Sequence, residues 1–298
     1  MVDTSHDVRV RATMVGPVAA RALRSGARGL VRAVFERSFY ASLGTQWICI
    51  GSVSLGAGPL NLLSAPWHSV RAMHPILRVG DAVGVHDGEL NAGNFRLPLH
   101  TVQLWRLEPT CIWSKASLAR GLASFADALP PRLPDEGLAC VLQPAGTHNL
   151  VTPVLNAARL PIRYLTQLVE EAATGLDADI DAERIAPLLG LGPGLTPSGD
   201  DYLGGVLVAL SLIGQTRLRA RLWQALEPLL VHRTTEVSRA HLAAAAEGFG
   251  SAALHDLLHA ILSDATDKTS AGIAAVAAIG NTSGWDALAG AIAVLQAM

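Results

Sequence analysis

The sequence predicts an α+β protein, with a β-rich N-terminal half followed by an all-helical C-terminal bundle. Before about residue 150, short apolar runs alternate with glycine, proline, asparagine and aspartate. After that point, apolar residues recur every three or four positions, which is typical of packed helices. We therefore expect a β-rich region over residues 1–150 and a helical domain over residues 151–298. The 298 residues, half of them hydrophobic (50%), provide enough apolar surface for both cores.

The expected strands of the N-terminal half are short and separated by turn-forming residues. Asp87 and Gly88 lie between two apolar runs, which indicates a β-hairpin. Seven arginines between residues 9 and 37 predict instead a surface arm and an amphipathic helix at the start of the chain. The strands are expected at residues 47–50, 61–63, 82–86, 89–91 and 102–104.

The expected helices are rich in alanine and leucine, and some are apolar nearly all round, which indicates burial. The first should end before Pro130 and Pro131, because proline cannot continue a helix. The helices are expected at residues 115–129, 154–174, 182–189, 201–213, 218–232, 235–247, 252–262, 269–279 and 286–298.

Composition excludes several classes of function. The net charge is −2 and aromatic residues make up 5%, so we expect no nucleic-acid partner. No apolar run reaches the roughly 18–20 residues that span a bilayer, so we expect no membrane partner. Cys49, Cys111 and Cys140 include no C-x-x-C pair, which predicts reduced thiols and a cytoplasmic protein.

The most informative stretch is residues 190–201, GLGPGLTPSGDD, which leads directly into an apolar helix. We name residues 190–205 the first junction. Its glycines fix a tight loop beside the free N–H groups of a helix start, which predicts an anion site. The expected anion-binding residues are Gly192, Gly194, Thr196 and Gly199.

The same stretch supplies candidate catalytic groups in Ser198, Asp200 and Asp201. A helix cap needs only one side-chain oxygen. Two adjacent carboxylates repel each other, so their presence is easier to explain if one binds substrate or a cation, or moves a proton.

A second junction, residues 280–290, repeats the pattern S-G-x-D-x-L-x-G before the last helix. Asp286 matches Asp201 and is a fourth candidate catalytic residue. The two junctions could face each other across one pocket, although S-G-x-D at the second could also be an ordinary cap. Its expected substrate-binding residues are Thr282, Ser283 and Gly284.

Two further clusters have weaker signals. His255 and His259 are spaced i and i+4, but no third ligand is evident, so we expect a half-exposed pair and no metal site. Arg233 or Arg239 could clamp an anion, or could belong to a polar capping region.

The run GLGPGLTPSGDDYLGG at residues 190–205 resembles the signature of the AllH-like family, also named DUF2877. IGNTSGWDALAG at residues 279–290 is similar to that family's second block. Residues 234–238 and 243–248 also fit, and residues 65–70 and 79–81 fit more weakly.

This resemblance implies a subunit of an oxamate carbamoyltransferase in allantoin and purine degradation. The implied reaction converts oxalurate and phosphate into oxamate and carbamoyl phosphate, so the substrates are small anions. The implied partners are two further subunits, one resembling an acyl-CoA synthetase. Carboxylates beside a bound phosphate would be unfavourable unless they were protonated, met by arginine, or bridged by a cation such as Mg²⁺.

Two alternatives fit the same residues. In one, the chain is a non-catalytic partner subunit whose apolar helices form the interface. In the other, which is less favoured, it is a stand-alone metal-dependent hydrolase of a small amide or ureido acid that uses the aspartates.

Overall fold

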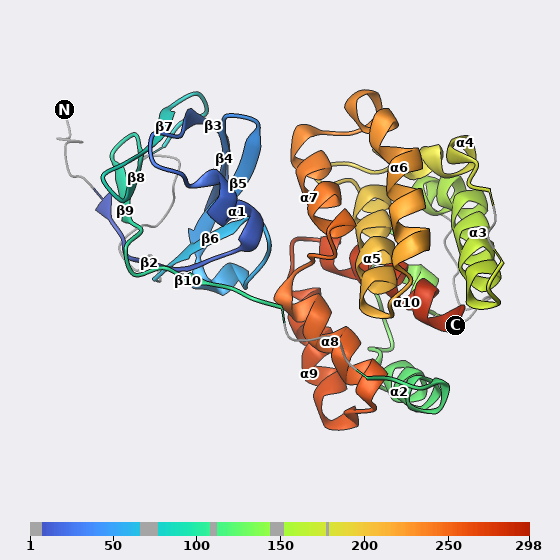
Figure 1. The fold of residues 1–298 in the computed structure, drawn as a ribbon. Helices are drawn as coiled ribbons and strands as arrows, with labels where there is room; N and C mark the ends of the chain where they lie inside the picture. Colours follow the sequence, from blue (N-terminus) through green and yellow to red (C-terminus); the bar gives the residue numbers. More distant parts are fainter. Residues whose placement is uncertain (1–7, 66–76, 108–111, 144–151, 177–178) are drawn as a thin grey trace. The chain divides into compact units, whose positions relative to one another are not determined.

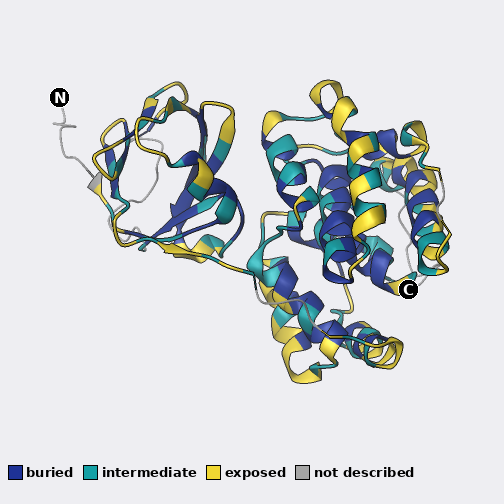
Figure 2. Cartoon of the chain, viewed as in Figure 1, coloured by how far each residue is buried: buried dark blue, intermediate teal, exposed yellow. Residues whose placement is uncertain are grey.

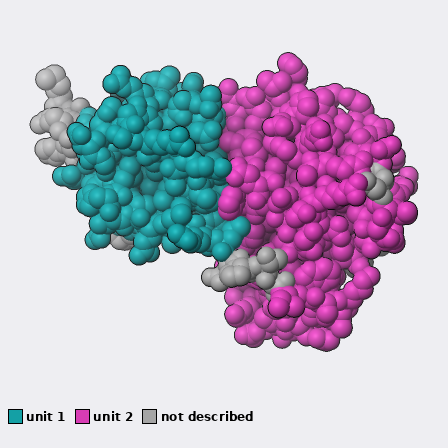
Figure 3. Space-filling view, viewed as in Figure 1, with its two compact units in different colours: residues 1–107 teal, residues 108–298 magenta. Residues whose placement is uncertain are grey.

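The computed structural model describes residues 8–65, 77–107, 112–143, 152–176 and 179–298 (Figure 1). Cys111 and most of the weak family segment at 65–70 lie outside the described residues. The chain divides into two compact units, residues 1–107 and 108–298, which Figure 3 colours separately. The first is built on one sheet and the second is helical, which confirms the predicted α+β class.

The first unit holds a ten-stranded mixed sheet in the order β1-β9-β8-β7-β3-β4-β5-β6-β2-β10. Its central ladder from β9 to β5 is antiparallel, whereas β5–β6, β1–β9 and β10–β2 pair in parallel. The strands are β1 (Val8–Arg9), β2 (Ala12–Val15), β3 (Arg28–Val34), β4 (Ser38–Leu43), β5 (Gln46–Ser52), β6 (Asn61–Ser64), β7 (Ala82–His86), β8 (Glu89–Ala92), β9 (Phe95–Pro98) and β10 (Gln103–Leu104).

The hairpin predicted at Asp87 and Gly88 is confirmed between β7 and β8. Both turn residues have positive φ, 51° and 73°, as a type I′ turn requires. The core beneath the sheet contains Phe39 and Phe95, whose rings meet edge to face with centroids 5.7 Å apart.

The arginine-rich start of the chain differs from the expected arm and amphipathic helix. A short helix, α1, is present at Pro17–Ala22, but Arg28 and Arg32 lie on strand β3, which pairs with both β4 and β7. Arg32 on β3 donates from Nε to Ser42 Oγ on β4 at 2.9 Å. Pairing with β4 and β7 satisfies the backbone N–H and C=O groups on both edges of β3, which favours the extended conformation over a helix.

The second unit contains nine α-helices among the described residues, and each predicted helix has a counterpart. Residues 182–189 form two shorter pieces because Pro187 lacks the N–H that would continue α4. No described helix is long and apolar enough to cross a membrane. The elements are α2 (Lys115–Ala128), α3 (Pro153–Ala173), α4 (Ala182–Ile185), α5 (Ser198–Leu212), α6 (Thr216–Arg233), α7 (Glu236–Ala246), α8 (Ala252–Ser263), α9 (Thr266–Ala277) and α10 (Ser283–Gln296), with 3₁₀ turns η1 (Val53–Leu55, first unit), η2 (Ala139–Leu142) and η3 (Ala186–Leu188).

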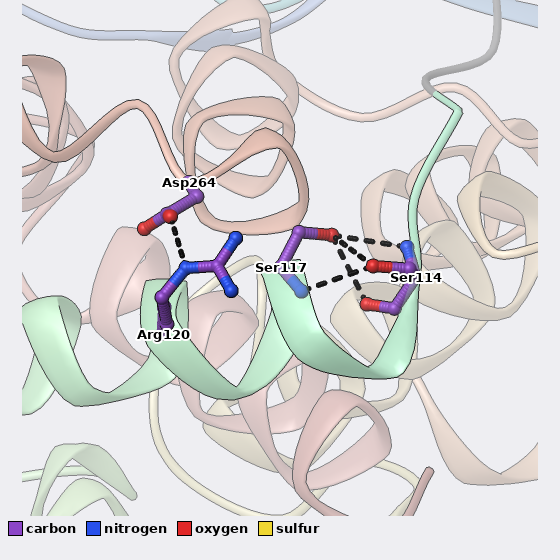
Figure 4. A network of polar contacts seen from close by, with 4 residues as sticks. All are labelled: Ser114, Ser117, Arg120 and Asp264. Atoms are coloured by element: carbon purple, nitrogen blue, oxygen red, sulfur yellow. Dashed lines mark hydrogen bonds and ion pairs between the residues drawn. The ribbon is translucent and has the colours of Figure 1, made fainter.

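The boundary between the units falls at residues 107–108, earlier than the change we expected near residue 150. The reason is that α2 packs against α8: a Cβ on Gly121 would lie 1.8 Å from the Ile261 carbonyl oxygen. Figure 4 shows Arg120 of α2 bonded through Nε to Asp264 Oδ2 at 2.6 Å, just after α8. The same view shows Ser114 and Ser117, which form a capping box at the start of α2.

Candidate active site

The site is built by the crossing of α5 and α10, the two helices that follow the junctions. A Cβ on Gly205 would lie 1.8 Å from the carbonyl oxygen of Ala287, and one on Gly290 would lie 2.0 Å from that of Tyr202. In the aligned motifs Gly205 matches Gly290 and Tyr202 matches Ala287. The two contacts are therefore reciprocal, and the repeat in the sequence is an approximate two-fold in space. Figure 2 shows buried residues along α5, as expected for an element inside the bundle.

This crossing brings the first turns of both helices together, as we inferred from the repeat. Thr196 Oγ1 of the first junction lies 3.0 Å from Ser283 Oγ of the second. Both hydroxyls bond to the carboxyl of Asp201, and the hydroxyl of Ser198 bonds in turn to Asp286. A serine hydroxyl of each junction is therefore hydrogen-bonded to the aspartate of the other junction: Ser283 to Asp201, and Ser198 to Asp286.

Asp286 is the fourth residue of α10 and is fully buried, with 0% exposure. Its Oδ1 accepts a 2.6 Å hydrogen bond from the backbone N–H of Leu138, just before η2, and its buried Oδ2 has no partner among the described residues. Gly137 has a φ of 70°, and a Cβ there would lie 2.5 Å from Asp286 Oδ1. Sequence reasoning missed both Gly137 and Leu138, because no motif links them to residues 148 positions away.

Asp201 is the fourth residue of α5, and its buried Oδ2 likewise has no partner in the part of the chain that the structure describes. Burial raises its pKa well above the ordinary value, and the negative charges of Asp286 and Asp200 raise it further. The hydroxyls of Ser283 and Thr196 oppose this shift. Burial also raises the pKa of Asp286, against hydrogen bonds from Leu138, Thr282 and Ser198. The site therefore contains two coupled carboxyl groups that resist being ionised together.

Asp200 points elsewhere, because successive residues of a helix are rotated by about 100°. Its Oδ1 accepts from the Gly190 N–H at 2.9 Å, and its Oδ2 accepts from Ser238 Oγ at 2.7 Å and from Thr234 Oγ1. Burial raises its pKa, and these three hydrogen bonds oppose the shift. Asp200 therefore fastens the first junction to the start of α7, and both of its oxygens are occupied.

The loop of the first junction is also held from α7 by Thr235. This residue caps α7 by accepting from Ser238 N at 3.0 Å, and its own hydroxyl donates to Leu195 O at 2.5 Å. The motif fragment T-T-x-x-S at residues 234–238 therefore holds the first junction in place through Thr234, Thr235 and Ser238.

The backbone donors differ from our expectation of a row of free N–H groups. The N–H of Gly199 donates to Leu191 O at 2.9 Å, and that of Gly284 donates to Ile279 O at 3.1 Å, because each loop folds back on its own helix. Gly192 and Gly194 have φ values of 111° and 98°, which glycine alone adopts readily. Their N–H groups have no acceptor among the described residues, so they remain candidate donors to an anion.

The other candidates lie apart from this geometry. His255 is buried in α8 rather than half-exposed, and its Nε2 accepts from the Gly250 N–H at 3.0 Å. Its pKa is lowered to about 4, mainly by burial. Within the described part of the chain, no group of three or more His, Cys, Asp or Glu side chains could hold a metal ion. Arg233 Nη2 lies 3.9 Å from Glu183 Oε2. Arg239 Nη2 lies 3.4 Å from Glu236 Oε1.

The anchor at Asp200 leads to a first prediction. Combining Ser238→Ala with Thr234→Val removes two of its three donors, so a buried carboxylate is left poorly satisfied. We expect the unfolding free energy to fall by about 2–4 kcal/mol, at roughly 1–3 kcal/mol for each lost partner of a buried group. Chemical denaturation followed by circular dichroism measures this. An unchanged midpoint would contradict the anchoring role, and Thr166→Val, which removes a local bond to Ile162 O on α3, is the control.

Residues 188–295 match a family model described as "Oxamate carbamoyltransferase subunit AllH". Both junctions, and the T-T-x-x-S segment that anchors Asp200, lie inside the matched region. No solved structure matches the chain. The match, which covers 108 of the 298 residues, supports the predicted resemblance to the AllH-like family.

Proposed function

Because residues 188–295 match the model of the AllH family, we propose that this chain is a subunit of a carbamoyltransferase complex in which the paired junctions form the active site. The observation that carries the proposal is the pair Asp201 and Asp286, whose Oδ2 atoms are both buried. Each keeps one carboxyl oxygen that no described residue bonds, and both lie within the family's matched segment. Buried unpartnered oxygens are costly, so a ligand that bonds to them would explain why they persist.

The proposed reaction is the interconversion of oxalurate plus phosphate with oxamate plus carbamoyl phosphate, in purine degradation in the cytoplasm. Such a transfer must bring two anions together and stabilise an oxyanion at the carbamoyl carbon. The N–H groups of Gly192 and Gly194 and the hydroxyl of Thr196 are the proposed anion donors. One preorganised donor of this kind lowers a barrier by roughly 3–4 kcal/mol.

The proposed roles of the three aspartates follow from their hydrogen bonds. Asp201 and Asp286 are the proposed proton-transfer groups, whereas Asp200, with both oxygens occupied, is a positioning residue. A second anion beside these carboxyls needs compensation. We propose that a partner subunit, of the acyl-CoA-synthetase-like kind, or a Mg²⁺ ion entering with phosphate, supplies the positive charge.

Ligand-dependent stability of the purified chain tests this proposal. Oxamate, oxalurate, phosphate and carbamoyl phosphate are added separately, with and without Mg²⁺, to wild type and to Asp286→Asn. A ligand at 100 times its Kd adds about 2.7 kcal/mol to the folded state, which is a clear rise in Tm. We expect a rise with at least one of these anions that Asp286→Asn removes.

The same measurement can contradict the proposal. If no ligand raises Tm, alone or with co-expressed partner subunits, the paired junctions are not the active site. A chain that co-purifies with those partners and yet binds none of the ligands would instead be a non-catalytic subunit.

A further inference from the structure

Because the two junctions are related by an approximate two-fold, the carboxyl groups of Asp201 and Asp286 have similar surroundings. Asp201 and Asp286 are both the fourth residue of a helix, and each accepts a bond from a serine hydroxyl of the other junction. Both retain one buried oxygen that no described residue satisfies. Asp286, which has no exposed surface, is the unpartnered buried group that points to a ligand.

We propose that Asp201 and Asp286 form a single acid–carboxylate pair that holds one proton across the two junctions and binds the carboxamide group of an amide substrate. This inference rests on the proposed function for the identity of the substrate. The existence of the shared proton is independent of that function.

The charges around Asp201 and Asp286 favour the state in which the two carboxyl groups together hold one proton over the state in which both are ionised. The titratable groups that act on it are Asp200 on α5, which adds negative charge, and Cys140 on η2, a thiol whose pKa is raised chiefly by burial. His241 on the neighbouring α7 has its pKa lowered by burial to about 4 and is neutral. No arginine, lysine or histidine among the described residues stabilises either carboxylate. Two buried like charges without a cation share a proton, as in the aspartic proteases.

Hydrogen bonding identifies which member of the pair carries the proton. Asp286 receives the backbone N–H of Leu138 at 2.6 Å in addition to hydroxyls, and a backbone N–H can only donate, which favours the ionised form. Asp201 receives hydroxyls alone, and a hydroxyl can turn to accept from a protonated carboxyl. We therefore assign the proton to Asp201 and the negative charge to Asp286.

An acid beside a carboxylate is complementary to an amide. The protonated carboxyl donates to the carbonyl oxygen of a carboxamide, and the carboxylate accepts from its N–H. Neither an isolated carboxylate nor a cation offers this combination. A ligand such as oxamate would satisfy both free oxygens with its amide end and leave its carboxylate for the donors of the first junction.

The same pair can move the protons of the transfer. As hydrogen phosphate forms a C–O bond to the carbamoyl carbon of oxalurate, its proton passes to the Asp286 carboxylate. The C–N bond breaks, and the oxamate nitrogen takes the proton of the Asp201 carboxyl with the electron pair of that bond. The products are oxamate and carbamoyl phosphate, and the pair again holds one proton.

A test without ligand examines the shared proton. The Tm of wild type, Asp201→Asn, Asp286→Asn and the double variant is measured from pH 4 to pH 9, with Asp127→Asn on the exposed face of α2 as control. A raised pKa stabilises the folded state at low pH and destabilises it as pH rises through the folded pKa. The Tm of each single variant should therefore rise relative to that of wild type as pH increases. The Tm difference between Asp127→Asn and wild type should stay constant.

Additivity distinguishes one shared proton from two independent groups. If the pair shares a proton, either single substitution already abolishes most of the destabilisation that appears at high pH. The Tm of the double variant should then exceed that of either single variant only slightly. Increases in Tm that are additive in the double variant, or that do not change with pH, would overturn the shared proton. This conclusion does not depend on the proposed function.

A second arm tests recognition of the amide. Binding of oxamate, with oxalate as the analogue that lacks the amide, is measured by calorimetry across the same pH range. Wild type should lose at least tenfold in oxamate affinity once the pair is fully ionised, and oxalate should bind at least tenfold more weakly than oxamate near pH 6. Asp201→Asn should bind oxamate without this pH dependence, because its amide N–H replaces the acid proton.

The outcomes of the second arm are separable. Equal affinity for oxalate and oxamate, or the same pH profile in wild type and Asp201→Asn, would overturn the amide-binding role. Absence of any oxamate binding, with or without the partner subunits, would overturn both that role and the proposed function, while the first arm still decides the shared proton.

Discussion

Gly205→Ala is expected to lower the unfolding free energy of the helical unit by about 3 kcal/mol or more. The added Cβ would lie 1.8 Å from the carbonyl oxygen of Ala287, and backbone on both sides leaves no flexible side chain to yield. Overpacking of a core costs about 1–3 kcal/mol where side chains can adjust, and two helix backbones cannot adjust cheaply. Gly290→Ala, where the Cβ would meet Tyr202 O at 2.0 Å, should behave in the same way because the crossing is reciprocal.

The matched control is Gly204→Ala, one residue away on the same helix. Its Cβ would have only the Ala245 Cβ within contact distance, at 3.9 Å, so alanine should fit. Alanine is favoured over glycine inside helices by about 1 kcal/mol, so this variant should be as stable as wild type or more stable. Denaturation followed by circular dichroism gives all three values. A Gly205→Ala protein as stable as Gly204→Ala would mean that α5 and α10 do not cross so closely.

Asp201→Asn and Asp286→Asn are each expected to reduce carbamoyl transfer by the assembled complex by about 10²–10⁴-fold, the usual contribution of a positioned acid or base. Neither variant should unfold the chain, because asparagine keeps the shape of aspartate and adds no buried charge. The loss should appear in kcat more than in KM, since proton transfer occurs in the transition state. Formation of carbamoyl phosphate from oxalurate and phosphate is the activity to measure, with Asp127→Asn as the unaffected control.

Two results would count against these roles. Full turnover by both variants would remove the pair from the chemistry. A loss confined to KM would mean that the aspartates only bind the ground state.

The sequence predicted the helical unit well and the sheet less completely. Helical periodicity is local, so the spacing of leucine and alanine was enough to place every helix of the second unit. The hairpin at Asp87 and Gly88 was equally visible, because the turn chemistry lies within two residues. Strand β3 was missed because its arginines mimic a surface helix, and only pairing with β4 and β7, from distant parts of the chain, makes it a strand.

The site divides in the same way. The sequence by itself determined the repeated S-G-x-D pattern, the buried helices that follow it and the match to the AllH family model, because all three depend on contiguous residues. Only the tertiary structure decided that Asp201 is paired with Asp286 while its neighbour Asp200 turns to Thr234 and Ser238. The physical reason is that a helix aims adjacent side chains in different directions, and what each meets depends on how distant helices pack. That packing was set here by two glycines that let α5 and α10 cross backbone to backbone.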